Sequence, residues 1–490
     1  MEYLTVNTLS LEAGTSTRPS SRWENFASAG CGRSRPGKTR AVSGAGEGET
    51  SDSRRLLRTT GQMTGLRGPS HGRDCRPATT GWWAGVLASL MLPLLGTGCG
   101  QTAAASYRLN LVESAKQQLK PEQEQQVANI LAALFGTPDE PFAPAECGLD
   151  EAKLKLAAGP VRSDIVGRKN GLYREHCAHC HGVTGDGMGP TAAFLNPYPR
   201  DYRPGVFKFK STERADKPTH ADLVMVLRNG LAGSSMPSFA LLSDAKIESL
   251  AEYVKYLSMR GEVELALMRA FFELDDEDQG KLPEDRDFLI DEIVMPVAES
   301  WQAAEDALID VPEMPADIDM AASIAKGKEL FYGNKANCVK CHGVTGLGDG
   351  QVNDYDDWNK VVVQAYKTVE GSLEQAGETS TWNMDADEAA EHRAELAWLD
   401  RYQRVLDGNA LPPRTIRPRN LREGVYRGGM RPLDLYYRIH AGINGAPMPA
   451  AKGTVPPEDI WHIVNYIRSL PYDFNGTLGV DRPMMARDRL

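Results

Sequence analysis

The pentapeptide Cys-x-x-Cys-His occurs twice in this chain of 490 residues, at 177–181 and at 338–342. Two cysteines three positions apart can form thioethers with the vinyl groups of one haem, while the next residue offers an imidazole to the iron. Paired cysteines also occur in zinc ribbons, where the two pairs usually lie about 15–20 residues apart. Here 161 residues separate the first cysteines of the two motifs, so each motif must complete its own site. We therefore expect two covalently attached haems, held by Cys177, Cys180 and His181 and by Cys338, Cys341 and His342.

The sequence around the two motifs is repeated as well. Both motifs continue as Cys-His-Gly-Val-Thr-Gly and then reach Gly-Asp-Gly. Farther along, Pro-Arg-Asp-Tyr-Arg-Pro-Gly-Val-Phe at 199–207 aligns with Pro-Arg-Asn-Leu-Arg-Glu-Gly-Val-Tyr at 418–426. One unit is therefore used twice, and it resembles the class I c-type cytochromes. The resemblance implies an all-α fold with two cytochrome c-like helical domains, each wrapped around one covalent haem c.

A repeated methionine loop predicts the sixth iron ligand. The pattern Gly-x-x-Gly-x-x-Met-Pro occurs at 230–237 and at 442–449. A single methionine is usually core filler, but a repeated Met-Pro in a glycine-rich loop is not. In the family that the chain resembles, such a methionine lies opposite the histidine, which implies Met236 and Met448 as axial ligands. Other methionines and histidines lie too near a haem motif or lack a counterpart in the other half, so we do not expect iron at Met188, Met430, His176, His179, His220 or His440.

Apolar residues at helical spacing follow each methionine loop and predict a core helix in each half. They are Ile247, Leu250, Tyr253, Val254 and Leu257 in the first half, and Ile460, Ile463, Tyr466, Ile467 and Leu470 in the second. The predicted organisation is a leader with a signal or lipoprotein segment and tether (1–105), a helical arm (106–160), a first cytochrome c domain (161–260), an acidic helical linker (261–322), a second cytochrome c domain (323–473) and a tail (474–490).

The second half is longer than the first between its predicted iron ligands. From His181 to Met236 is 55 residues, but from His342 to Met448 is 106. The excess predicts an insert near 353–410, with an acidic helix around 385–407. The insert could be an interaction lid over the second haem or a structural cap, and the sequence does not distinguish these two roles.

The N-terminal region predicts export. Residues 82–98 are an apolar run of 17 residues, long for a signal peptide and short for a membrane span. The following Cys99 lies in a segment that resembles a lipoprotein cleavage box, so we favour acylation there; ordinary cleavage near 103–105 and an uncleaved anchor are the alternatives. All three place the body outside the cytoplasm, as a periplasmic protein attached to the membrane or released from it.

Cysteine use and charge add to this interpretation. Outside the haem motifs only Cys31, Cys75, Cys99 and Cys147 occur, so we expect no disulfide framework, and Cys147 is interpreted as a buried small residue. The formal net charge is −11 although the first 98 residues are basic, so the body is strongly acidic. This argues against nucleic acid and favours docking with a basic patch on a redox partner, although solubility alone explains it equally well.

A haem whose two axial positions are filled by protein has no open position for a substrate. We therefore expect no enzyme activity, but outer-sphere electron transfer between respiratory redox partners through two His/Met-ligated haems. Two alternatives remain. One is a dihaem cytochrome c peroxidase, which needs a displaceable sixth ligand; the other is a haem-based gas sensor, in which Met236 or Met448 would have to dissociate.

Overall fold

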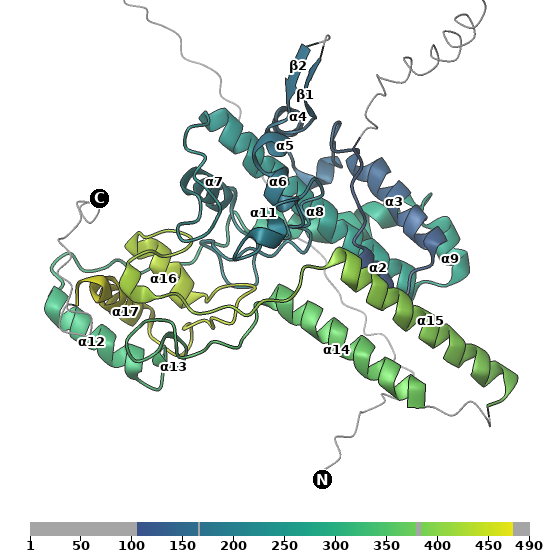
Figure 1. Ribbon diagram of the computed structural model, residues 1–490. Coiled ribbons are helices and arrows are strands. Elements are labelled where there is room, and N and C mark those ends of the chain that lie inside the picture. The colour runs from purple at the N-terminus through teal and green to yellow at the C-terminus, as the bar shows by residue number, and fades with distance from the viewer. Residues whose placement is uncertain (1–104, 165–166, 379–383, 474–490) are drawn as a thin grey trace, which may run out of the picture. The chain divides into compact units, whose positions relative to one another are not determined.

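The computed structural model describes residues 105–164, 167–378 and 384–473, all within one compact unit that spans 97–490. These residues are mainly helical (Figure 1). The helices of the first half are α2 (Leu111–Lys116), α3 (Pro121–Phe135), α4 (Glu151–Ala157), α5 (Leu172–His176), α6 (Ala178–His181), α7 (His220–Asn229) and α8 (Asp244–Glu273). Then follow α9 (Asp276–Lys281), α10 (Arg286–Phe288), a π-helical turn (Leu289–Val294), α11 (Met295–Ala303), α12 (Met320–Tyr332), α13 (Val339–His342), α14 (Asp357–Glu378), α15 (Ala386–Asn409), α16 (Pro432–His440) and α17 (Pro457–Ser469).

One two-stranded sheet interrupts the helical pattern within the described residues. Strands β1 (Val161–Asp164) and β2 (Gly167–Asn170) pair antiparallel, with Val161 opposite Asn170. The sequence prediction of an all-α fold missed this hairpin because its residues are mostly polar and lack the alternation of apolar and polar residues that marks a half-buried strand. Val161 is exposed, so the hairpin adds little to the core.

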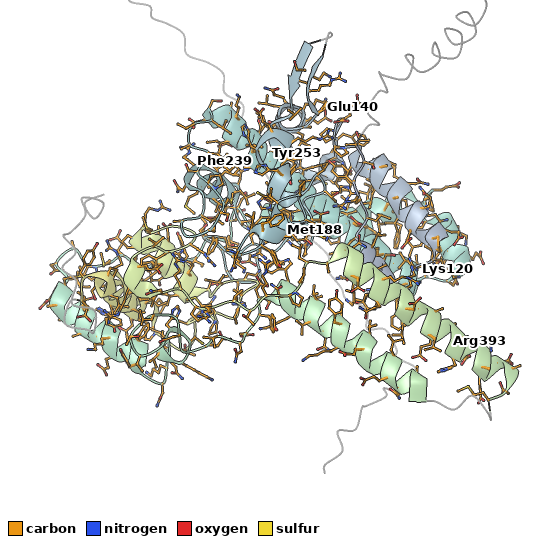
Figure 2. All side chains as sticks on the ribbon, viewed as in Figure 1. Lys120, Glu140, Met188, Phe239, Tyr253 and Arg393 are labelled. Atoms are coloured by element: carbon orange, nitrogen blue, oxygen red, sulfur yellow. The ribbon has the colours of Figure 1, made fainter. Side chains whose placement is uncertain are left out.

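The first hydrophobic core is built along α8. The predicted stripe is buried there, with Ile247 and Leu250 at most 1% exposed, and Tyr253 lies among the crowded side chains of this region (Figure 2). The arm predicted over 106–160 is helical, and its α3 and α4 pack on the same helix. Tyr256 on α8 donates a hydrogen bond to the carbonyl of Phe135 at 2.5 Å, which ties the arm to the core.

The predicted boundary at residue 260 falls in the middle of α8. The helix continues to Glu273 because apolar residues recur at helical spacing beyond 260, and Val263, Leu267 and Phe271 are buried in the first core. Segment 289–301, which lies in the predicted linker 261–322, also returns to this core. Its Trp301 is 1% exposed and donates from Nε1 to Glu262 Oε1 at 2.8 Å.

The second hydrophobic core lies between α12 and α17, and it contains the predicted stripe of α17. Ile460 and Ile463 are fully buried there, and Phe331 of α12 packs edge-on against Tyr466 at a centroid distance of 5.3 Å. The helices cross closely at Gly327, where a Cβ would overlap the carbonyl of His462. Glycine is therefore required by the approach of the two backbones.

The predicted insert forms two helices, α14 and α15, that pack against each other and against α2 of the arm (Figure 1). Trp398 Nε1 donates to the carbonyl of Ala115 at 2.7 Å, and Arg401 donates to the carbonyl of Leu119 at 2.7 Å. Arg401 also pairs with Glu124 at 2.6 Å. Most of the insert is thus a support for the arm, and residues at its two ends reach the site described below.

Across the described ranges, no helix is both long enough and apolar enough to span a lipid bilayer. The apolar run at 82–98 and Cys99, on which the predictions of export and acylation rest, lie outside the described residues, as does the predicted tail.

Candidate haem sites

The first Cys-x-x-Cys-His motif lies at the turn between α5 and α6, with Cys177 immediately before α6 and His181 at its end. The Nδ1 atom of His181 is 3.0 Å from the carbonyl oxygen of Arg200, so Nδ1 carries the proton and donates it. The lone pair is therefore on Nε2, the atom that a metal would take. Tyr202 stacks on the imidazole at a centroid distance of 4.7 Å and restrains its rotation.

Burial lowers the pKa of His181 to about 4, so the imidazole is neutral at neutral pH. A neutral imidazole with a protonated Nδ1 is the form that ligates a metal. Neither cysteine of the motif forms a disulfide, and both thiols are free to react with a vinyl group.

The second motif repeats this arrangement. Cys338 precedes α13 and His342 ends it. His342 Nδ1 lies 3.2 Å from the carbonyl oxygen of Arg419, which is the repeat counterpart of Arg200, and burial lowers the pKa of His342. Tyr202 is replaced in the repeat by Leu421, so the second imidazole has no stacked ring at that position.

The two methionine loops have the same backbone hydrogen bond. The amide of Leu231 donates to the carbonyl of Met236, and the amide of Ile443 donates to the carbonyl of Met448, both at 3.1 Å. Each methionine is partly buried against the hydrophobic core of its own half. Each loop therefore holds its thioether at the edge of a core, where a sulfur ligand is shielded from water.

A cavity of about 1370 Å³ brings all of these predicted residues together. Its lining includes both cysteine pairs, both motif histidines, and Met236 and Met448. Apolar side chains from both halves complete the walls, among them Leu223, Leu227, Val254, Ile463 and Ile467. An apolar, partly enclosed space with a few polar groups is suited to a large planar cofactor.

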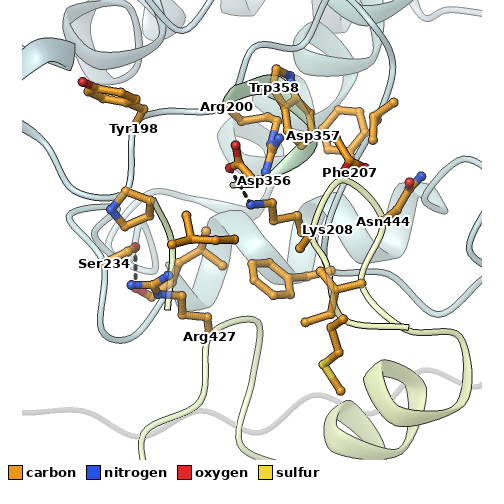
Figure 3. A pocket seen from close by; sticks show the side chains of 18 of the residues that line it. Tyr198, Arg200, Phe207, Lys208, Ser234, Asp356, Asp357, Trp358, Arg427 and Asn444 are labelled. Carbon is orange, nitrogen blue, oxygen red and sulfur yellow. Dashed lines mark hydrogen bonds and ion pairs between the residues drawn. The ribbon is translucent and has the colours of Figure 1, made fainter. Parts of the chain in front are cut away.

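The polar groups of the cavity fit the carboxylates of such a cofactor. Arg200 is partly buried and, among the described residues, pairs with no carboxylate; its guanidinium carbon lies 3.3 Å from the ring centroid of Trp358 (Figure 3). Burial lowers the pKa of Arg200 to about 10 and, together with the charge of Arg200, lowers that of Lys208 to about 8. Among the described residues, Asp356 is the one carboxylate that pairs with Lys208, at 3.0 Å.

Trp358 Nε1 is a buried donor without a partner among the described residues. Together with the excess of positive charge, this donor matches the propionate carboxylates of haem. The chain therefore fits haem with thiols for the vinyl groups, imidazole and thioether for the iron, and cations for the propionates. Haem bound there would supply one-electron chemistry at its iron.

The other methionines and histidines occupy different surroundings. Met188 lines the cavity on the segment that follows His181, and Met430 is 44% exposed and lies outside the lining. His220 is held by Glu248 at 2.6 Å and His440 lies 3.3 Å from Glu213; neither lines the cavity. His176 and His179 line it from the motif turn. In the part of the chain that the structure describes, no group of three or more His, Cys, Asp or Glu side chains is arranged to hold a metal ion.

The comparison with known families decides the nature of the first site. Residues 167–254 match the family model described as cytochrome c oxidase, cbb3-type, subunit III. The chain contains a c-type cytochrome domain. This domain includes Cys177, Cys180, His181 and Met236, and it indicates covalently bound haem c and haem-based electron transfer.

Wider similarity is limited. No curated protein matches the sequence. Among solved structures, the reducing HAO-like protein complex of Kuenenia stuttgartiensis contains a chain that is 21% identical, with a TM-score of 0.38, over 64% of this chain and 98% of that one.

Sequence reasoning missed three residues of the cavity. Arg200 and Lys208 lie in or next to the repeated segment 199–207, and the pair of Pro-Arg dipeptides was a signal that could have identified Arg200. Trp358 gave no such signal, because it belongs to the insert and has no counterpart in the first half.

Proposed function

We propose that this protein is a dihaem c-type cytochrome that transfers electrons between redox partners through two His/Met-ligated haems. The second haem is held by Cys338, Cys341, His342 and Met448 in the same way as the first. The observation that carries the proposal is the shared cavity, which both histidine–methionine pairs line. Two further similarities between the halves support the proposal. Each motif histidine donates to the carbonyl of an arginine at the same repeat position, and each methionine carbonyl accepts a hydrogen bond from the backbone amide five residues earlier.

Because both pairs line one cavity, electrons pass between the two haems inside the chain. His/Met ligation favours the ferrous state and raises the reduction potential, which suits a relay late in a respiratory chain. With both axial positions filled, the protein is an electron carrier and not an enzyme, in contrast to a peroxidase or a gas sensor.

The proposed location is periplasmic, with attachment to the membrane through acylated Cys99 or an N-terminal anchor. The acidic body would dock with a basic patch on the donor or acceptor, so its rate of reduction should fall as salt rises. Fractionation of cells that produce the wild-type chain and a Cys99→Ala variant tests attachment through acylation.

The functional test is a redox titration of the holoprotein combined with near-infrared absorption of the ferric form. Met-ligated ferric haem has a weak near-infrared band, so Met236→Ala and Met448→Ala should each remove about half of it and lower the potential of one haem. Carbon monoxide should not bind the native ferrous protein, and peroxide should not be turned over. Carbon monoxide binding would favour the gas sensor, and rapid peroxide turnover would favour the peroxidase.

A further inference from the structure

The two methionine loops differ at one position that matters for their rigidity. In the first loop, Ser234 Oγ donates to the carbonyl of Leu231 at 2.7 Å and accepts from the amide of Met236 at 3.3 Å. The repeat places Ala446 at the position of Ser234, and alanine has no hydroxyl. The second loop therefore lacks the two side-chain bonds that fix the first loop next to its methionine.

A residue from the other half of the chain replaces these bonds. Arg214 Nη1 donates to the carbonyl of Met448 at 2.7 Å, and Arg214 Nη2 donates to the carbonyl of Ala446 at 3.0 Å. The planar fork of a guanidinium holds two acceptors in a fixed geometry, and its charge strengthens both bonds. Arg214 thus binds the backbone of the second loop on either side of Pro447.

The segment that carries Arg214 is itself fixed. The amide and hydroxyl of Ser211 both donate to Asp222 Oδ2 at 3.0 Å, and Thr212 donates to the carbonyl of Lys217 at 2.6 Å. Asp222 is buried in the first turn of α7, the helix that leads to the first methionine loop. The guanidinium is therefore presented from a rigid base that belongs to the first half.

The neighbouring Glu213 reaches residues on both sides of the same loop. Its carboxylate lies 3.3 Å from His440 Nε2 and 2.5 Å from Lys452 Nζ. Partial burial opposes ionisation of Glu213, but its hydrogen bonds with Lys452 and His440 lower its pKa. Lys452 is exposed and Glu213 is 33% exposed, whereas His440 is buried. The contacts of Glu213 add to the bidentate contact of Arg214 and do not replace it.

We propose that Arg214 is a positioning residue for Met448: the first half of the chain holds the second methionine loop in the conformation that places its sulfur on the iron of the second haem. This inference rests on the proposed function, because it requires a haem ligated by His342 and Met448. It makes ligation of the second haem dependent on Arg214 of the first half, whereas the corresponding two bonds of the first loop come from its own Ser234.

The experiment uses the full holoprotein with the substitutions Arg214→Ala and Arg214→Lys. Arg214→Ala should remove about half of the near-infrared band and lower the potential of one haem, as Met448→Ala does, with the other haem unchanged. Arg214→Lys keeps the charge but not the fork, so it should lose less of the band. Arg228→Ala is the control, because Arg228 is a half-exposed arginine of the same half that pairs with Asp244 and should leave both haems as in the wild type.

A second-site variant separates positioning from a general loss of structure. Ala446→Ser, added to Arg214→Ala, gives the second loop the hydroxyl that Ser234 gives the first, and it should restore the lost part of the band. An unchanged band and unchanged potentials in Arg214→Ala would overturn the inference, and so would equal changes at both haems or a failure of Ala446→Ser to restore the band. A haem count of one per chain in the wild type would instead overturn the proposed function.

Discussion

The guanidinium of Arg200 lies over the ring of Trp358, with the guanidinium carbon 3.3 Å from the ring centroid. One residue belongs to the first repeat and the other to the insert of the second, so this contact joins the two halves at the cavity. A cation over an aromatic face away from water is worth about 2 kcal/mol. Trp358→Ala should therefore lower the free energy of unfolding by about 2 kcal/mol.

A double-mutant cycle with Arg200→Ala measures this contact directly. The two single substitutions and the double substitution, compared by denaturant unfolding of the holoprotein, should show a coupling of about 1–2 kcal/mol. Strictly additive effects would mean that the two side chains do not stabilise each other.

Gly445 of the second methionine loop lies against the ring of Trp358, which a Cβ at that position would overlap. The φ angle of Gly445 is +72°. Gly453 is the matched control, because its φ angle is +82° and no atom lies near the position of an added Cβ. Alanine at either position costs about 1 kcal/mol from the backbone alone. Gly445→Ala should cost about 1–3 kcal/mol more than Gly453→Ala because of the ring, as measured by thermal unfolding. Equal costs would show that Trp358 moves aside freely.

The contact of Arg401 with the arm predicts a local effect that leaves the haem sites intact. Arg401 donates to the carbonyl of Leu119 and pairs with the carboxylate of Glu124. The side chains of Arg401 and Glu124 are both partly buried. Arg401→Ala should cost about 1 kcal/mol and speed amide hydrogen exchange in α2, with an unchanged near-infrared band. Arg404→Ala is the matched control on the same helix, since its pair with Asp400 is exposed. Equal exchange rates in both variants would contradict a supporting role of the insert.

Cys147 should behave as a structural thiol. It is 1% exposed, and burial raises its pKa to about 12. Since the thiolate is the reactive form, alkylation by iodoacetamide at pH 8 should be far slower in the folded protein than after unfolding, and it should accelerate as the pH rises toward 12. Peptide mass spectrometry of the alkylated protein gives the rate at this cysteine. Similar rates in folded and unfolded protein would point to an accessible, reactive thiol.

The sequence predicted those features that rest on short repeated motifs. The apolar stripes of α8 and α17 are buried in separate cores, as predicted. Periodicity and repetition carry this information locally. The sequence did not predict that the motif histidines and the two methionines line one cavity, and their role as iron ligands stays a prediction. The c-type cytochrome domain at 167–254 was likewise predicted from its own residues.

Features that depend on contacts between distant segments were not predictable. The helical spacing of apolar residues continues past residue 260, so no local signal ends α8 there. Burial of the part of α8 beyond residue 260 depends on segment 289–301, which folds back onto the first core. The pairing of α15 with α2, and the contact of Arg214 with Met448, join residues more than 200 positions apart. Such contacts are set by tertiary packing, and a single sequence contains no local pattern for them.

The haem content of the purified chain tests the central claim most directly. Pyridine haemochrome analysis, together with metal analysis of the same sample, should give two covalently bound haems and no zinc per polypeptide. Replacing Cys338 and Cys341 with alanine should leave one haem. Fewer than two haems in the wild-type chain, or zinc at either cysteine pair, would contradict the account.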